Sequence, residues 1–73
     1  MKYNEKIREL REDRDLRQID LAKILNTTQS YYGKYERGIH PIPIEHIEKL
    51  CLFYNVSADY ILGLPKNMPY PER

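Results

Sequence analysis

Residues 27–38, TTQSYYGKYERG, concentrate side chains that form hydrogen bonds or carry positive charge. A helix turns by about 100° per residue. A helix that begins at Thr28 therefore places Tyr32 and Tyr35 on one face and Tyr31 at its border. The pattern predicts two buried tyrosines and one tyrosine at the rim. The outward face offers small, hydrogen-bonding and cationic side chains, from Gln29, Ser30, Gly33, Lys34 and Arg37.

The glycine in the middle of this predicted helix has two explanations. Glycine inside a helix costs about 0.5–1 kcal/mol relative to alanine. Close approach of another surface to the helix would require Gly33. Simple tolerance of an exposed glycine would also account for it, and the sequence leaves both explanations open.

Two charged residues fall close to apolar helix faces. Arg11 lies four residues after Ile7, and Glu36 lies four residues after Tyr32. Half-buried charges need partners. We expect an ion pair between Arg11 and Glu36 that ties the first helix to the third; the alternative is that both side chains bend out to water.

Apolar spacing and capping residues predict the other helices. Tyr3, Ile7 and Leu10 fall at i, i+4 and i+7, which predicts a first helix that ends near residue 13. Four further helices are expected at about 18–25, 28–37, 43–54 and 57–63. The residues expected to begin these helices are Thr28 and Ser57 as N-caps and Pro43 at a first helical position. The residues expected to end helices are Asn26, Gly38, Asn55 and Gly63. The expected inward residues are Leu21, Ala22 and Leu25 in the second helix, and Ile44, Ile47, Leu50, Cys51 and Tyr54 in the fourth.

Length and composition limit the classes of protein to which this chain can belong. Seventy-three residues with no strand pattern predict one small all-α domain over residues 1–63. The remaining residues, 64–73, contain three prolines and are expected to form a flexible C-terminal tail. A lone cysteine, an N-terminus without an apolar signal region and the lack of a long apolar run predict a cytoplasmic protein without membrane contact.

The sequence offers no set of residues for catalysis or metal binding. His40 and His46 are six residues apart across two prolines, with no further ligands at useful spacing. Cys51 lies on an inward helix face, where a small buried thiol needs no further role. Neither a Ser/His/Asp set nor a phosphate-binding glycine loop is present. We therefore expect no enzymatic activity, no cofactor, no metal and no small-molecule ligand.

The run QIDLAKILNTTQSYYGKYERG resembles the helix-turn-helix of the Cro/CI-type (XRE, lambda-repressor-like) DNA-binding family. Counted from Gln18 as position one, the matching positions are five, nine, fifteen and eighteen, at Ala22, Asn26, Tyr32 and Tyr35. PIPIEHIEKLCLFYNVSADYILG is similar to the family's fourth and fifth helices, so the resemblance covers residues 5–63. It implies a compact five-helix fold in which the second and third helices form the helix-turn-helix, at about residues 18–37.

The resemblance also implies roles on DNA. Contacts to bases are expected from Gln29, Ser30, Gly33 and Lys34. Contacts to the sugar-phosphate backbone are expected from Arg14, Arg17, Gln18, Thr28, Tyr31, Arg37 and His40. The family pattern supports the Arg11–Glu36 salt bridge and makes Phe53 and Tyr60 candidates for dimer contacts.

Two residues depart from the family pattern. Asn26 replaces the usual glycine of the turn, and asparagine tolerates the left-handed conformation needed there. Arg17 stands where relatives often have a capping serine or threonine. Arginine cannot cap, and a cation at a helix N-terminus is mildly unfavourable. A phosphate contact would compensate for it.

Two functions are compatible with these features. The first is a bacterial or phage transcriptional repressor, which as a homodimer would bind a near-palindromic operator with two helices about 34–36 Å apart in successive major grooves. The second is a protein-interaction module, such as an antitoxin or anti-regulator. The net charge of only +1 and the exposed aromatic residues motivate this alternative.

Overall fold

The structure is a computed structural model that describes residues 2–66, 68, 69 and 71, with Lys2 described only in its backbone. It contains five helices, α1 (Lys2–Asp13), α2 (Gln18–Ile24), α3 (Gln29–Glu36), α4 (Ile44–Tyr54) and α5 (Ala58–Leu62). The described residues form no strand, and the fold is all-α as predicted. Part of the predicted tail, at positions 67, 70, 72 and 73, lies outside the described residues.

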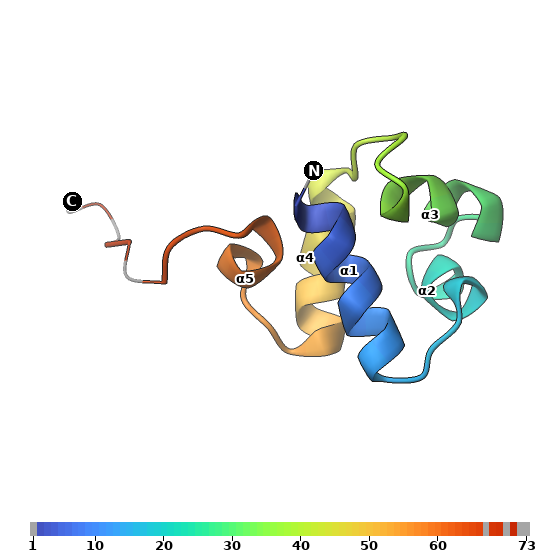
Figure 1. Ribbon diagram of the computed structural model, residues 1–73, viewed down its shortest axis with the longest axis horizontal. Helices are drawn as coiled ribbons and strands as arrows, with labels where there is room; N and C mark the ends of the chain where they lie inside the picture. The colour runs from blue at the N-terminus through green and yellow to red at the C-terminus, as the bar shows by residue number, and fades with distance from the viewer. Residues whose placement is uncertain (1, 67, 70, 72–73) are drawn as a thin grey trace.

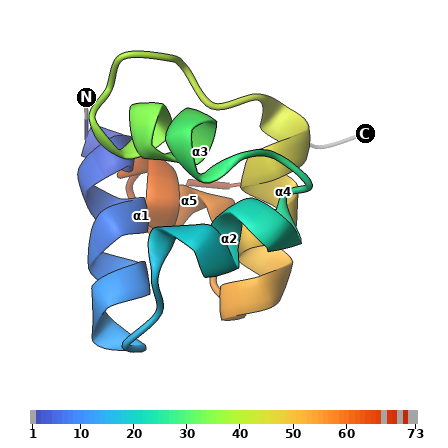
Figure 2. The same cartoon turned by 90° about the vertical axis from the view of Figure 1, so that its right-hand side faces the viewer.

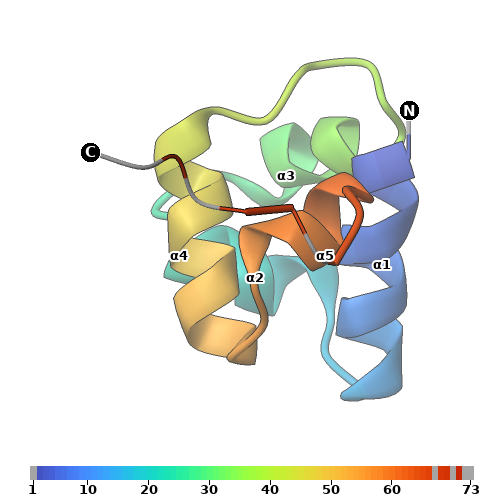
Figure 3. The same ribbon diagram turned by 90° about the vertical axis from the view of Figure 1, so that its left-hand side faces the viewer.

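The helices are arranged around α1 and α4. Figure 1 shows α2 and α3 on one side of this pair and α5 on the other. Viewed from the first side, α2 and α3 lie in front (Figure 2). Viewed from the second side, α5 lies between α1 and α4 (Figure 3). Contacts join α2 to α3, α1 to both α3 and α5, and α4 to α5. The face formed by α2 and α3 is therefore separated from the α5 side by the core.

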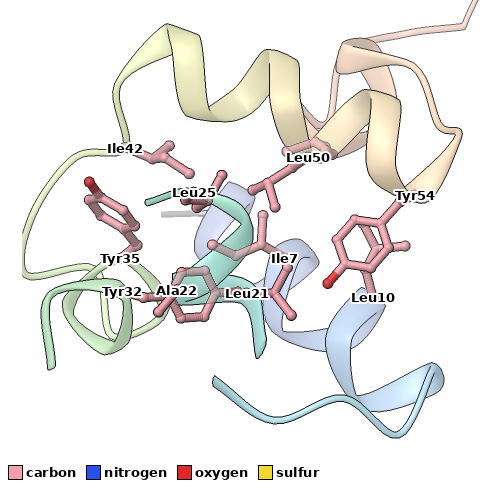
Figure 4. Packing of buried hydrophobic residues seen from close by; sticks show 11 residues of the cluster. Ile7, Leu10, Leu21, Ala22, Leu25, Tyr32, Tyr35, Ile42, Leu50 and Tyr54 are labelled. Atoms are coloured by element: carbon pink, nitrogen blue, oxygen red, sulfur yellow. The ribbon is translucent and has the colours of Figure 1, made fainter. Parts of the chain in front are cut away.

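The core collects the apolar faces that the sequence predicts (Figure 4). Tyr32 and Tyr35 are 0% and 1% exposed, whereas Tyr31 is 42% exposed. The predicted division of the three tyrosines is therefore confirmed. The other buried hydrophobic residues are Ile7, Leu10, Leu21, Ala22, Leu25, Ile42, Leu50, Tyr54 and Ile61, with Ile47 and Cys51 packed against them.

The start of α4 differs from the prediction. Pro43 is the N-cap rather than the first helical residue, and Ile44 is 76% exposed rather than buried. Ile42 enters the core instead and is 8% exposed. Its backbone N–H donates a hydrogen bond of 3.2 Å to the hydroxyl of Tyr3 in α1. The extended conformation of Pro43 turns the preceding residue inward, so Ile44 begins the helix beyond the edge of the core.

The predicted caps and turns are present. Thr28 accepts a hydrogen bond from the Tyr31 N–H at 3.1 Å, and Ser57 caps α5 in the same way. Asn26 has a φ of 58° between α2 and α3, so asparagine takes the left-handed position as expected. These features fix where α3 begins and how it leaves α2.

A buried carboxylate joins three helices. Glu36 in α3 has a side chain that is only 3% exposed. The Arg11 guanidinium in α1 donates to both carboxylate oxygens, with Nε–Oε2 at 2.7 Å and Nη2–Oε1 at 3.0 Å. Gln18 in α2 donates from Nε2 to Oε1 at 3.1 Å. Arg11 also reaches the backbone oxygen of Leu16, in the loop between α1 and α2. The expected pair of Arg11 and Glu36 is therefore present, and it holds α2 as well.

These contacts determine the ionisation of Glu36. Burial acts to raise the pKa of the carboxyl group, but the hydrogen bond from Arg11 above all, together with that from Gln18 and the charge of Arg11, outweighs it and the pKa is lowered. A carboxyl with a lowered pKa in the folded state contributes stability at pH values above its unfolded pKa, about 4.3. That contribution is lost as the pH falls through the folded-state value.

Removal of the charge on Glu36 is expected to destabilise the protein. The substitution Glu36→Gln leaves the largely buried Arg11 side chain, which is 14% exposed, without a counter-charge, and this costs about 3 kcal/mol. Urea denaturation at pH 7 measures this change. Glu12→Gln is the matched control because Glu12 pairs with Arg8 at an exposed site, and its expected effect is below about 1 kcal/mol. Equal effects of the two substitutions would contradict the structural role of Glu36.

Stability is also expected to fall in acid, because protonation of Glu36 removes the same ion pair. The melting temperature of the wild-type protein should drop as the pH is lowered from 5 towards 3, while that of Glu36→Gln should drop less. Thermal denaturation followed by circular dichroism measures both curves. Parallel curves would assign the acid sensitivity to other carboxyl groups.

Candidate nucleic-acid interface

The outward face of α3 carries three of the four residues predicted to contact bases. Gln29 and Ser30 are exposed at its N-terminal end, and Lys34 is half-buried one turn later. The fully buried Ala22 allows α2 to pack closely against α3 on the opposite side. Figure 2 shows that α3 lies along the outside of the molecule rather than under another helix. The structure thus presents a row of hydrogen-bonding side chains on a fixed helix.

An aromatic group extends this face beyond the end of α3. The ring of Tyr31 stacks on His40, with centroids 5.1 Å apart and planes 22° from parallel. It meets Tyr35 edge-on at 5.4 Å, and Lys34 Nζ lies 6.0 Å from its centroid. Tyr31 is therefore held in place on three sides. His40, which the sequence analysis placed in a loop, is brought onto the same surface as Lys34.

Gly33 is not an exposed glycine. It is buried, and a Cβ built on it would lie 3.3 Å from Gln18 Oε1 and 3.4 Å from Arg37 Nη1. The tolerance explanation for this glycine is therefore wrong. The surface that approaches it closely in the free protein belongs to the chain itself. A contact between Gly33 and a base stays a prediction, and it requires these two side chains to move.

Arg17 at the N-terminus of α2 has a partner that the sequence analysis did not assign. Asp20 Oδ2 accepts a hydrogen bond from the Arg17 N–H at 2.8 Å, and Asp20 Oδ1 lies 3.3 Å from the guanidinium. These interactions, the backbone hydrogen bond above all, lower the pKa of Asp20. Asp20 lies three residues after the N-cap Arg17, and an acidic residue at this spacing is the sequence feature that could have predicted the interaction. The side chain of Arg17 is still 76% exposed.

Arg14, which was expected to contact the DNA backbone, binds the C-terminal end of α4 instead. Its Nη2 donates to the backbone oxygen of Tyr54 at 3.0 Å, and its guanidinium carbon lies 5.2 Å from the centre of the Tyr54 ring. Arginine commonly binds the free carbonyl groups at a helix C-terminus. The structure therefore gives Arg14 a role in joining the end of α1 to the end of α4, which the sequence did not indicate.

The candidate dimer residues lie outside the α3 face. Phe53 in α4 is 42% exposed and Tyr60 in α5 is 47% exposed. Lys6 Nζ lies 4.8 Å from the centre of the Tyr60 ring, beside a shallow groove of about 430 Å³. Within the described ranges, no group of histidine, cysteine or acidic side chains is arranged to hold a metal ion. No described helix is both long and apolar enough to cross a membrane.

Comparison with known proteins is consistent with this geometry. The chain is 37% identical over 62 residues to the HTH-type transcriptional regulator YobD of Bacillus subtilis, covering 85% of this chain and 55% of YobD. It is 39% identical over 54 residues to the cryptic phage CTXphi transcriptional repressor RstR of Vibrio cholerae, covering 74% and 49%. It is 33% identical over 60 residues to the antitoxin PezA of Streptococcus pneumoniae, covering 82% and 38%. The chain thus spans about half the length of these relatives, or less.

A family model described as helix-turn-helix matches residues 7–61, which include all of α2 to α4 and most of α1 and α5. This match covers the buried ion pair, the turn at Asn26 and the outward face of α3. The chain belongs to the Cro/CI-type helix-turn-helix family.

Proposed function

We propose that the protein binds double-stranded DNA in a sequence-specific manner, with α3 in the major groove. The observation that carries this proposal is the exposed polar face of α3, held on a helix whose other face is fully buried. The major groove admits an α-helix. The amide of Gln29 can pair with N6 and N7 of adenine, and Lys34 can reach O6 and N7 of guanine. Ser30 lies between them on the same face.

Contacts to phosphates would fix the register of α3 in the groove without reading sequence. Arg17 and Arg37 flank α2 and α3 with exposed cationic side chains. Tyr31 and His40 form a rigid edge beside them. Thr28 and Gln18 lie at the helix N-termini that would face the backbone. Arg14 is omitted from this set because its guanidinium binds the end of α4.

We further propose that the protein acts as a transcriptional repressor. Support comes from relatives named as a transcriptional regulator and a phage transcriptional repressor. A homodimer on a near-palindromic operator suits a domain that presents one recognition helix, because two copies then bind two half-sites. Phe53 and Tyr60 are the proposed contacts between the copies.

A second candidate is a protein-interaction module. The relative named as an antitoxin supports it, as do several large apolar side chains exposed on α4, on α5 and just beyond α5. Under this alternative the main partner is another protein and binding to duplex DNA is weak.

Selection of binding sites from a random duplex DNA pool, at near-physiological salt, tests the main proposal. An enriched inverted repeat with half-sites about one helical turn apart is the expected result. A single enriched half-site would support DNA recognition but contradict binding as a dimer. Absence of enrichment would contradict DNA recognition and favour the protein-interaction module.

Gln29→Ala is expected to weaken binding to the selected site by about tenfold or more, because it removes a bidentate contact to a base. The melting temperature should hardly change, since the side chain is exposed. Fluorescence anisotropy with labelled duplex measures the affinity. An unaltered affinity would contradict a contact between Gln29 and a base.

Charge on the α3 face is expected to matter more than charge elsewhere. Lys34→Ala and Lys49→Ala each remove one positive charge, but Lys49 lies on an exposed face of α4. Lys34→Ala should weaken DNA binding by several-fold more than Lys49→Ala. Equal losses would indicate general attraction to DNA instead of binding through α3.

The affinity for DNA should fall steeply with salt, because phosphate contacts release counterions. Arg37→Ala should reduce the slope of log K against log salt concentration by about one and weaken all sequences alike. Anisotropy titrations at several salt concentrations measure this slope. A slope equal to that of the wild-type protein would exclude a phosphate contact from Arg37.

A further inference from the structure

The first turn of α1 binds the loop between α3 and α4, residues 37–43, at both of its ends. Asn4 Nδ2 donates a hydrogen bond of 3.0 Å to the backbone oxygen of Glu36, the last residue of α3. The Tyr3 hydroxyl accepts a hydrogen bond of 3.2 Å from the Ile42 N–H, near the other end of the loop. Figures 2 and 3 both show the loop beginning beside the N-terminal end of α1 and running across to α4. Two neighbouring residues of α1 thus hold the loop where it leaves α3 and where it enters the core.

The hydrogen bond from Asn4 also meets a requirement of the helix end. The last carbonyl groups of a helix have no partners within the helix, and Asn4 supplies a side-chain donor to one of them. The same amide lies beside Gly38, since a Cβ built on this glycine would be 3.6 Å from Asn4 Nδ2. Gly38 turns the chain with a φ of 73°, and the N–H of Ile39 then donates to the backbone oxygen of Lys34 at 2.9 Å. The loop therefore folds back along α3 from the point that Asn4 holds.

His40 lies between the two bound ends of the loop. Its ring stacks on Tyr31 of α3, with centroids 5.1 Å apart. Its neighbours are not anchored in the core, because Ile39 is 58% exposed and Pro41 is exposed as well. Burial therefore does not fix the middle of the loop. The position of the imidazole depends on the stacking and on the hydrogen bonds that hold the loop.

We propose that Tyr3 and Asn4 position His40 for a contact with a phosphate of the DNA. This inference rests on the proposed function for the phosphate contact. It gives the first turn of α1 a role in DNA binding, although α1 lies outside the helix-turn-helix of α2 and α3. A ring N–H of histidine can donate to a phosphate oxygen, and a hydrogen bond weakens steeply when its donor is misdirected. Tyr3 and Asn4 are positioning residues in this arrangement, and His40 is the residue that touches the DNA.

A measurement without DNA tests whether α1 holds the loop. Tyr3→Phe removes one hydroxyl group and keeps the ring that packs against the core. The Ile42 N–H then loses its acceptor, so its hydrogen exchange in D₂O, followed by NMR, should become faster by about fivefold or more. The Leu25 N–H, which donates to the Leu21 oxygen, is the internal control, and its exchange should change by less than about twofold. Equal acceleration of both amides, or an unchanged rate for Ile42, would overturn the proposal.

Double variants test whether the loop acts through His40. Tyr3→Phe should weaken binding to the selected duplex by about threefold or more, since the imidazole is no longer held at the phosphate. Combined with His40→Ala, it should bind within about twofold of His40→Ala alone, because the contact that it positions is already absent. Asn4→Ala should show the same dependence on His40 through the other end of the loop. Unaltered affinities of both single variants, or losses that multiply in the double variants, would overturn the proposal.

The two measurements also separate this inference from the proposed function. If the wild-type protein selects no DNA sequence, the proposed function fails, and the phosphate contact of His40 fails with it. The exchange rate of the Ile42 N–H in Tyr3→Phe still decides whether the first turn of α1 holds the loop.

Discussion

The buried carboxylate of Glu36 is the interaction on which the geometry of the α2–α3 unit depends. It receives hydrogen bonds from Arg11 in α1 and Gln18 in α2 while it belongs to α3. An ionised group at this depth is tolerated only because its partners replace the water that it has lost. Hydrophobic packing is non-directional, whereas a carboxylate with two bound partners has one favoured arrangement. The ion pair thus fixes the relative positions of three helices that the apolar core alone would leave less defined.

Helix α3 combines two opposite requirements in eight residues. Its inner face buries Tyr32 and Tyr35, and its outer face carries Gln29, Ser30 and Lys34. Because the tyrosines are fully packed, the outer side chains are held by a helix that cannot rotate. Tyr31 connects the two faces, since its ring contacts buried Tyr35 on one side and His40 on the other. The rigidity of the surface therefore comes from the core beneath it.

The distribution of charge is more informative than its total. A net charge of +1 does not indicate a nucleic-acid partner. In the fold, Arg11 is neutralised by Glu36 and Arg14 is bound at the end of α4. Arg17, Lys34 and Arg37 remain around α2 and α3, although Arg17 is paired with Asp20. Charged residues that stabilise the fold thus alternate along the sequence with charged residues around α2 and α3. Only their positions in the folded structure distinguish the two groups.

Local sequence predicts the helices, most of their caps and most residues of their inner faces, because these depend on residue spacing and on backbone conformation. The division of the three tyrosines followed from helical periodicity, and the left-handed Asn26 followed from its residue type. The pairing of Arg11 with Glu36 was one of two outcomes that periodicity allowed, and the family resemblance favoured it. Long-range packing set three features that local spacing does not predict. Ile42 enters the core in place of Ile44, Arg14 binds the end of α4, and the Gln18 and Arg37 side chains lie beside Gly33. These features depend on which segments far apart in the chain come to lie side by side, and no spacing along a single helix contains that information.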